Sequence, residues 1–371
     1  VTKSKKIRIY PTSDQRVLLR QWFGTARFTY NKTVAILNTT DTQANWKAIK
    51  TGILHDLPDW AKETPYQIKS VAVRDACIAV RATKKTGEKQ FVSFKSKRQP
   101  SDSIFIPKSA IKPKGVYHTI LGALFMSEAL PDNIKDSRLV KEGDKYYLCV
   151  SYTVATSKRK SNGRVVALDP GVRTFLTYFH ERGFGWLGHH AINRIQRLCF
   201  HLDDLLSRAS KANRQSKRNM RKAANRIRKR IRHLVDELHK KTARWLVDNF
   251  DIILLPTFET SQMTCKAGRK LHKRSVRQML TLSHYRFKQF LKHKAKETGC
   301  IVVGVCEAYT SKTVSWTGEI VQKLGGAKVI KDSWGLRMDR DLNGARGIFL
   351  RALGDSPWLL TISNLQTMHS A

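Results

Sequence analysis

The first 155 residues show two hydrophobic patterns in succession. Residues 5–10 alternate basic and apolar side chains, as a half-exposed strand does. Pro11 ends this strand, and Thr12 with Gln15 fits a capping box at a helix start. Helical spacing continues in pieces, including residues 67–82. We therefore predict one strand followed by a helical insertion.

From residue 91 the chain changes to short apolar runs separated by Pro, Gly and Asp, which indicates strands joined by turns. The predicted strands are residues 91–95, 103–106 and 146–152. They indicate a return to a β-barrel or sheet. Residues 157–163 are rich in Lys, Arg and Ser and have the composition of a linker.

The second half of the chain alternates between strand and helix patterns. Strands are predicted at residues 165–169, 174–179, 185–187, 251–255 and 301–305, and helices at 191–249 and 275–297. Three strands, then helix, strand, helix and strand, is the element order of the ribonuclease H-like fold. We therefore expect an α/β domain. Fold alone does not give function, which depends on the residues of the site.

Three acidic residues stand where these elements end or begin. Asp169 and Glu307 each follow an apolar strand pattern, and Asp341 lies in the first turn of a predicted helix. Acids are scarce, at 29 against 69 Lys plus Arg, so their positions at element ends are informative. Converging carboxylates can hold two divalent cations about 4 Å apart. Mg²⁺ suits such a site because it takes few carboxylates and keeps its waters.

The overall charge predicts a polyanionic partner. The formal net charge is +40 and the pI is about 10.3. Nucleic acid is the first choice, because Lys and Arg release counterions from phosphates. A membrane surface is the weaker alternative, since no 18-residue apolar run and no secretory signal is visible. The charge would also suit a basic protein of the ribosomal type, although such proteins are usually shorter.

The densest basic segment has no acid from residue 205 to residue 235. Its Lys and Arg residues recur three or four positions apart, which places them in a stripe along a helix. We expect nucleic-acid contacts from Arg214, Lys217, Arg218 and Arg221. The alternatives are a solvated helix face and a nuclear import signal at residues 226–232. A helix lying along a phosphate backbone would give no sequence specificity.

The six cysteines include no C-x-x-C pair. Their spacing therefore predicts neither a disulfide framework nor a zinc site. We expect a reduced, intracellular protein.

Five groups of motifs follow one another along nearly the whole chain. They are I-Y-P at 9–11 with Q-W-F-G-T-A-R-F-T-Y-N-K at 21–32, F-K-S-K-R at 94–98, A-L-D-P-G-V-R at 167–173, E-A-Y-T-S-K-T at 307–313 and D-R-D-L-N-G-A-R at 339–346. In this order they resemble the TnpB and Fanzor proteins, which are transposon-associated RNA-guided nucleases related to type V CRISPR effectors. Each motif alone is a weak signal, but five in family order are a strong one.

The resemblance implies a domain plan. Residues 1–13 would be the first strand of a wedge-type β-barrel, 14–90 a helical recognition insertion and 91–156 the rest of the barrel. After the linker at 157–163, residues 164–354 would form a RuvC-type, ribonuclease H-like nuclease domain, followed by a C-terminal tail at 355–371. Residues 260–277 within it are a candidate lid, with an ordinary flexible loop as the alternative.

The resemblance also implies the catalytic acids. Asp169 matches the first acid and Asp341 the last; Asp339 is the fallback, and its other role is to cap the following helix. Most TnpB-like proteins carry the middle glutamate after the fourth strand, where this chain has a proline. We favour Glu307, which fits the displaced glutamate of Fanzor-like proteins, over Glu259.

A second departure from the family concerns zinc. The family usually has a zinc ribbon with two C-x-x-C pairs, and the corresponding region here is 311–338. The four ligand positions hold Val314, Thr317, Lys331 and Trp334. None of these side chains supplies a thiolate or imidazole ligand. We therefore expect no structural zinc, with Trp316 and Trp334 packed in its place.

The implied function is that of an RNA-guided DNA endonuclease with two Mg²⁺ ions. A locus-encoded guide RNA of the omega type would pair with double-stranded target DNA beside a short adjacent motif. We expect one protein chain in this ribonucleoprotein and no membrane role. The location would be the nucleus in a eukaryotic setting and otherwise the cytoplasm or nucleoid.

Further nucleic-acid contacts are predicted by residue type. Lys312 and Arg346 lie beside the acids and would steady the scissile phosphate. In the N-terminal half the candidates are Tyr30, Asn31, Lys32, Gln67, Lys69, Arg74, Lys95, Lys97 and Arg98. The alternative for each is an ordinary solvated side chain.

Two other classes of function stay open. One is a guide- or nucleic-acid-binding protein with a decayed nuclease site, because the zinc cysteines are missing. The other is a non-guided nuclease of the same fold, such as a junction resolvase or a ribonuclease H. Metal-dependent cleavage separates the first from the RNA-guided nuclease, and dependence on one defined RNA separates the second.

Overall fold

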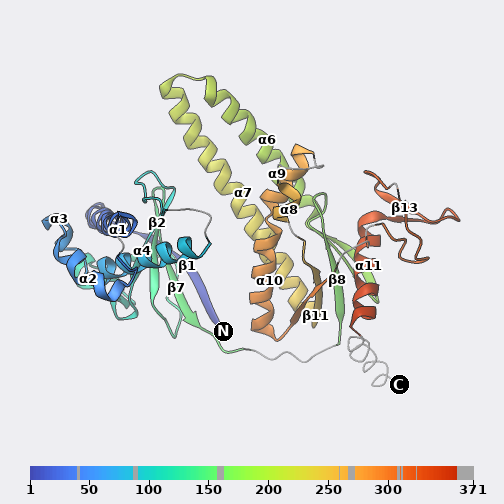
Figure 1. Ribbon diagram of the computed structural model, residues 1–371, viewed down its shortest axis with the longest axis horizontal. Helices are drawn as coiled ribbons and strands as arrows, with labels where there is room; N and C mark the ends of the chain where they lie inside the picture. The colour runs from blue at the N-terminus through green and yellow to red at the C-terminus, as the bar shows by residue number, and fades with distance from the viewer. Residues whose placement is uncertain are drawn as a thin grey trace. The chain divides into compact units, whose positions relative to one another are not determined.

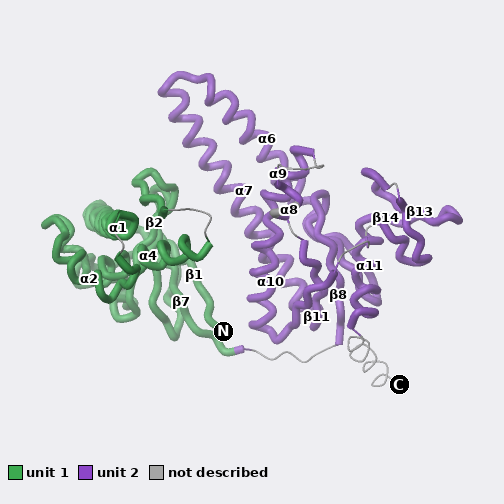
Figure 2. Tube along the Cα trace, in the orientation of Figure 1, with its two compact units in different colours: residues 1–155 green, residues 156–371 purple. Residues whose placement is uncertain are grey.

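The computed structural model describes residues 1–39, 42–86, 91–156, 163–258, 260–265, 272–306, 310, 312–322 and 324–356. The chain divides into two compact units, Val1–Ala155 and Thr156–Ala371 (Figure 2). Each unit has its own hydrophobic core. The boundary falls beside the segment with linker composition, of which residues 157–162 lie outside the described part.

The first unit begins with a strand and four helices. They are β1 (Thr2–Tyr10), α1 (Ser13–Thr39), α2 (Trp46–His55), α3 (Asp59–Lys62) and α4 (Tyr66–Thr86). The predicted capping box opens α1: the Thr12 N–H donates to Gln15 Oε1 at 3.0 Å, and the Gln15 N–H donates to Thr12 Oγ1 at 3.4 Å. The helical region predicted after the first strand is therefore present.

The rest of the first unit is mostly a sheet. Its elements are β2 (Ser101–Ile106), β3 (Ile111–Lys112), β4 (Gly115–Val116), α5 (His118–Leu121), β5 (Phe125–Met126), β6 (Ser137–Glu142) and β7 (Lys145–Thr153). The main sheet has the order β2-β6-β7-β1-β5 with antiparallel pairs. Its outer strands, β2 and β5, are not paired with each other in the described residues, so the sheet is open and no closed barrel is formed.

The strand predicted at residues 91–95 is wrong, because these residues have no regular secondary structure. Two side chains of α1 bind this backbone instead of a neighbouring strand. Asn31 Nδ2 donates to the Lys95 carbonyl at 3.0 Å, and Asn31 Oδ1 accepts from the Lys95 N–H at 2.8 Å. Asn38 Nδ2 donates to the Val92 carbonyl at 3.2 Å. These amides satisfy backbone groups that a strand would pair in a ladder.

The second unit is a mixed sheet with helices on both faces (Figure 1). Its elements are β8 (Val165–Pro170), β9 (Leu176–His180), β10 (Gly183–Leu187), α6 (His189–Lys211), α7 (Arg214–Asn249), β11 (Ile252–Pro256), α8 (Thr260–Thr264), α9 (Lys273–Leu282), α10 (His284–Thr298), β12 (Ile301–Val305), β13 (Val329–Lys331), β14 (Arg337–Asp339) and α11 (Arg340–Asp355). The strand order is β10-β9-β8-β11-β12. β10, β9 and β8 pair antiparallel, whereas β11 runs parallel to β8 and β12.

Strand β8 is buried on both faces, which explains its continuous apolar sequence. Val166 and Leu168 pack with residues of α7 and α10. Val165 and Ala167 pack with Ile348 and other residues of α11. The sheet therefore separates α7 and α10 from α11, and successive residues of β8 face different helices.

Both helical regions predicted in this unit are divided. Residues 191–249 form an antiparallel hairpin of α6 and α7, because Asn213 interrupts the helix and its side chain accepts from the Ser216 N–H at 2.9 Å. Residues 275–297 are divided between α9 and α10 at Ser283, whose φ is 52°. No helix within the described ranges has the length and apolar character needed to cross a membrane.

The candidate lid at 260–277 is partly helical. α8 covers its start, residues 266–271 lie outside the described part, and α9 takes its end. Arg277 on α9 forms an ion pair with Asp203 on α6 at 2.9 Å. The end of the predicted lid is therefore a packed helix and not a loop.

Candidate functional site

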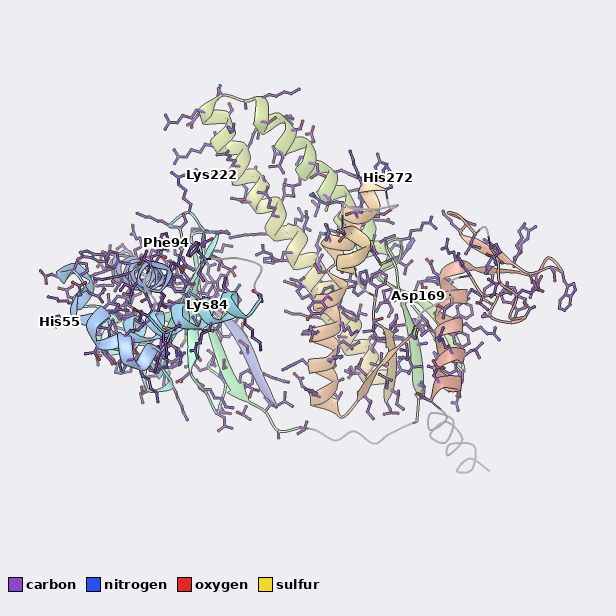
Figure 3. All side chains as sticks on the ribbon, in the orientation of Figure 1. His55, Lys84, Phe94, Asp169, Lys222 and His272 are labelled. Atoms are coloured by element: carbon purple, nitrogen blue, oxygen red, sulfur yellow. The ribbon has the colours of Figure 1, made fainter. Side chains whose placement is uncertain are left out.

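Asp169 on β8 lies beside α11, the helix whose first turn carries Asp341 (Figure 3 labels Asp169). The contact is made at Gly344. A Cβ added to Gly344 would lie 2.5 Å from Asp169 Oδ2, so the Asp169 carboxylate rests against the backbone of α11. Asp341 lies three residues before Gly344 and thus on the same side of the helix. The two acids therefore share one surface.

The environment of Asp341 disfavours its negative charge. Burial raises the pKa of Asp341, and the nearby Asp339 carboxylate raises it further, while Arg173 and Arg340 act in the opposite direction. Asp339 is the N-cap of α11, where its side chain accepts from the N–H groups of Asp341 at 2.9 Å and Leu342 at 3.1 Å. The site thus concentrates carboxylates, which a bound cation would stabilise.

The two candidates for the third acid, Glu307 and Glu259, both lie outside the described residues. Across the ranges that are described, no group of three or more His, Cys, Asp or Glu side chains is placed to hold a metal ion. The third metal ligand therefore stays a prediction from the sequence.

Asn343 fixes the segment that follows Thr310 onto α11. The side chain of Asn343 is fully buried; its Nδ2 donates to the Thr313 carbonyl at 2.8 Å, and its Oδ1 accepts from the Ser315 N–H at 2.9 Å. Arg346, one turn on, donates to Ser315 Oγ at 3.0 Å. Lys312 is exposed. Arg346 is therefore held by the segment that carries Ser315, whereas Lys312 is exposed.

Two buried histidines support the turn that follows Asp169. The Phe175 ring stacks between His284, at 4.9 Å, and His239, at 5.2 Å. Burial lowers the pKa of both histidines to about 4, so both are neutral at neutral pH. His284 Nε2 must then donate to the Gly171 carbonyl, at 3.1 Å. No sequence pattern identifies these residues, since a lone histidine within a helix pattern carries no distinguishing signal.

Thr177 on β9 is a second residue that the sequence analysis missed. The strand register places it directly opposite Asp169, and paired residues of antiparallel strands face the same side. Thr177 is buried, and its hydroxyl has no hydrogen-bond partner within the described structure. Arg173 is a third missed residue: it is exposed, and its charge acts on Asp341. Thr177 thus adds a buried hydroxyl on the side of the sheet that carries Asp169, and Arg173 adds an exposed charge near Asp341.

The region in place of the zinc ribbon is held by hydrogen bonds. Trp316 Nε1 donates to Asp332 Oδ2 at 2.7 Å, and Asp332 Oδ1 accepts from the Leu336 N–H at 2.8 Å. Trp334 is 84% exposed, so the prediction that it packs in place of zinc is wrong. The Asp332 carboxylate already closes the loop between β13 and β14, and the Trp334 ring is left outside it.

The basic residues Arg214, Lys217, Arg218 and Arg221 lie together at the start of α7, where they and Lys222 line a hollow. Figure 3 labels Lys222 on this helix. Apolar side chains of α6 and α7 pack against each other within the hairpin. The four residues predicted to contact nucleic acid thus line one hollow of the protein, and their binding role stays a prediction.

In the first unit, three of the candidate contact residues form one cluster. Tyr30 is only 6% exposed, and Lys95 Nζ lies 3.9 Å from the centre of its ring. Asn31 binds the backbone of Lys95, as described above. Burial lowers the pKa of Lys95. These side chains hold residues 91–95 against α1 and do not present free polar groups to a ligand.

The other candidate nucleic-acid contacts of this unit differ in whether their side chains already have a partner within the protein. Lys32 pairs with Asp56, Lys69 Nζ donates to the Lys62 carbonyl at 2.7 Å, and the Arg74 guanidinium lies 5.5 Å from the centre of the Phe105 ring. A second set is exposed and comprises Gln67, Lys97 and Arg98. These three are the candidates that are open to a partner.

Two family models match segments of this chain, and several viral proteins are similar to most of it. A model of the Cas12f1-like TNB domain matches residues 284–348, and a model of the OrfB IS605 helix-turn-helix domain matches residues 1–41. The chain is 25% identical over 389 residues to putative transposase A625R of Paramecium bursaria Chlorella virus 1, covering 95% of this chain and 87% of that protein. It is also 25% identical over 397 residues to TnpB-like protein L79 of Acanthamoeba polyphaga mimivirus, covering 96% and 74%.

Among solved structures, the chain is similar to Cas12f1 in its complex with sgRNA and target DNA, with a TM-score of 0.53 and 12% identity over 94% of this chain and 98% of that one. At this identity the likeness concerns the mixed α/β fold alone. Both family models match segments that carry the motifs quoted above, and the viral relatives extend over nearly the whole chain. The chain is therefore similar to TnpB-like proteins over nearly its whole length.

Proposed function

We propose that this protein is an RNA-guided DNA endonuclease that hydrolyses phosphodiester bonds at a RuvC-type site. The observation that carries the proposal is the contact of the Asp169 carboxylate with α11 at Gly344, three residues after Asp341 on the same helix. The strand order β10-β9-β8-β11-β12, with three antiparallel strands and then parallel pairing, supports a ribonuclease H-like domain. The fold likeness to Cas12f1 supports the same assignment.

The residues present fit Mg²⁺. Carboxylates are the hard oxygen ligands that this ion takes. Burial and the Asp339 carboxylate raise the pKa of Asp341, and a bound cation would act in the opposite direction. The orphaned Thr177 hydroxyl adds a polar group beside Asp169. Asp169 and Asp341, with Glu307 as the proposed third ligand, would hold two ions. The chemistry that such ions supply is activation of a water and stabilisation of the leaving oxygen.

The remaining side chains of the site would position the strand to be cut. Arg173, which is exposed and whose charge acts on Asp341, would bind phosphate oxygens. We assign the same role to Arg346, whose guanidinium donates to Ser315 Oγ. Asn343 and His284 would act indirectly, since they hold the backbone on either side of the acids. We expect products with a 5′-phosphate and a 3′-hydroxyl.

The partners in this proposal are a locus-encoded guide RNA of the omega type and double-stranded DNA with an adjacent motif. The basic surface of α7 and the exposed Gln67, Lys97 and Arg98 support nucleic-acid binding. The open sheet of the first unit would correspond to a wedge domain and α1–α4 to a recognition insertion. A Fanzor-type protein would act in a nucleus.

The first test is to express the chain with its native flanking locus and to sequence the RNA that co-purifies. One discrete locus-encoded RNA with a variable end supports guide loading. A heterogeneous mixture of host RNA would make non-specific binding the better explanation of the charge.

The second test is cleavage of a guide-matched DNA. Asp169→Ala and Asp341→Ala should each abolish cleavage while the RNA stays bound. Asp355→Ala is a matched control, because Asp355 is an exposed acid at the other end of α11. Full cleavage by both site variants would contradict the assignment of Asp169 and Asp341 as catalytic acids. Glu307→Ala and Glu259→Ala, compared in the same assay, identify the third acid.

A further inference from the structure

The sheet face that carries Asp169 is covered by α11 only in part. α11 packs on β8, β9 and β11. β10 is the edge strand of the sheet, and two of its large side chains, Phe184 and Trp186, are 51% and 49% exposed. An exposed aromatic pair on a sheet edge is costly to leave in water and is typical of a binding surface.

The strand register shows which face this pair occupies. Trp186 is opposite Thr177, and Thr177 is opposite Asp169. Directly opposed residues of antiparallel strands face the same side, so Trp186 and Asp169 share one face. They are two strands apart, which corresponds to roughly 10 Å between their backbones.

A second pair of opposed residues confirms that the aromatic side chains of β10 lie on the face that carries Asp169. Phe184 is opposite Phe179, and the Phe179 ring packs against Phe349 of α11 with 5.5 Å between ring centres. The Phe184 and Trp186 rings are 5.7 Å apart and nearly perpendicular. Both rings therefore lie beside α11, on the side of the sheet that carries the acids.

The opposite side of β10 is filled. A Cβ added to Gly185 would lie 2.7 Å from the Tyr178 hydroxyl, so the Tyr178 ring covers the strand there. The open aromatic pair belongs to the acid-bearing side alone. It is flanked by the exposed Arg182 in the turn between β9 and β10, and the buried, unpartnered Thr177 hydroxyl lies between it and Asp169.

We propose that Phe184 and Trp186 form a stacking surface for unpaired bases of single-stranded DNA whose phosphates pass the Asp169–Asp341 site. Aromatic side chains stack on any base, so the surface would orient the strand without selecting a sequence. The net charge of +40 and the exposed Arg173 and Arg182 favour a polyanionic strand over an apolar peptide. The identity of the strand as a cleavage substrate rests on the proposed function, but the stacking contact itself does not.

Photo-cross-linking tests the contact without requiring cleavage. Full-length Asp169→Asn protein would be irradiated with a single-stranded oligonucleotide that contains 5-iodouracil, and the modified peptides would be identified by mass spectrometry. The proposal expects cross-links within β10 (Gly183–Leu187). Cross-links confined to α7 or to the first unit would overturn it.

Binding measurements then isolate the contribution of the bases from that of the phosphates. The ratio of Kd for an abasic oligonucleotide to Kd for oligo-dT of equal length reports base stacking. Trp186→Ala should lower this ratio about tenfold, as expected for the loss of one base–aromatic stack, and leave the abasic Kd unchanged. Trp186→Phe should retain most of the ratio. Tyr285→Ala is the matched control, because Tyr285 is 68% exposed on α10, which packs on the other face of the sheet.

The possible outcomes separate this inference from the proposed function. An unchanged ratio in a folded Trp186→Ala protein would refute stacking, even if the protein cleaves guided DNA. A reduced ratio in a protein that cleaves nothing would support stacking and contradict the nuclease proposal. Loss of self-association in Trp186→Ala with no change in the ratio would assign the surface to contact between copies of the chain and also overturn the inference.

Discussion

The acid site between β8 and α11 and the basic surface at the start of α7 reach a high charge density in different ways. On α7 a single helix places Arg214, Lys217 and Arg221 along one stripe, and their side chains extend from the hairpin. At the acid site a strand and a helix from distant parts of the chain must pack closely before Asp169 and Asp341 meet. The first surface needs only helical periodicity, whereas the second depends on tertiary packing.

This difference predicts different responses to substitution. The acid site is fixed by backbone contact and by buried histidines, so a single added methyl group should disturb it. The α7 surface is exposed and made of repeated equivalent charges, so the loss of one should have a small and graded effect. The four predictions that follow run from the largest expected effect to the smallest.

Gly344→Ala should have the largest effect. Its Cβ would lie 2.5 Å from Asp169 Oδ2, which forces the carboxylate or α11 to move. A displacement of about 1 Å at a reacting centre can lower the rate about 100-fold. Gly354→Ala is the control on the same helix, because its Cβ would meet nothing within 4 Å. Guided DNA cleavage is the measurement, and equal rates for the two variants would show that the site tolerates misplacement.

The buried histidines should make the protein sensitive to acid. The unfolded chain binds protons at His239 and His284 as the pH falls below about 6.5, but the folded protein does so only near pH 4. The unfolded state therefore gains protons first, and the free energy of unfolding decreases as pH falls through this window, by about 3 kcal/mol at most for each histidine.

Urea unfolding at several pH values measures this loss. His239→Gln should show a smaller decrease between pH 7 and pH 4.5 than the unmodified protein. His233→Gln is the control, since His233 is exposed on the same helix. An unaltered pH profile in His239→Gln would mean that His239 is not held neutral by burial.

Arg221→Glu should weaken nucleic-acid binding evenly across sequences. If the side chain contacts a phosphate, the slope of log K against log salt should decrease by about one. Arg244→Glu makes the same change of charge on α7, but Arg244 is already paired with Asp248 at 2.6 Å. Fluorescence anisotropy at several salt concentrations would measure both. Identical slopes for the two variants would show that the predicted basic surface has no special role.

Asp339→Asn should have the smallest effect. Asparagine also caps helices well, so α11 should keep its start. Removal of the Asp339 charge should move the pKa of Asp341 downward, because that charge is one of the causes that raise it. Cleavage should stay within about tenfold of the unmodified protein, as expected for a group outside the first ligand shell. Complete loss of cleavage would instead make Asp339 the metal ligand and restore the fallback assignment.

Local patterns predicted much of the fold. The capping box of Thr12 and Gln15, the strand β7 and the helix α4 are all present, because their signals depend on neighbouring residues. The strand predicted at residues 91–95 failed, since a strand needs a partner and Asn31 binds this backbone instead. The expected barrel remains an open sheet in the described residues because pairing between β2 and β5 depends on non-local geometry.

The candidate site was predicted only in part, because the sequence shows where elements end but not how they pack. Asp169 and Asp341 could be identified from the sequence because each stands at the end of a regular element. His284, Thr177 and Trp186 gave no such signal, since their positions next to the acids depend on strand register and on helix packing. The failed prediction for Trp334 arose because Asp332, and not a ring, closes the loop between β13 and β14.

The sequence by itself determined the charge, the basic stripe of α7, the strand end that carries Asp169, the helix start that carries Asp341, and the likeness to the TnpB-like family. These properties are local or additive, so they can be read without a fold. The tertiary structure decided that Asp169 contacts α11 at Gly344, that two neutral histidines support the turn after Asp169, and that Phe184 and Trp186 share the face of the acids. Each of these depends on close packing between segments that only the folded chain brings together.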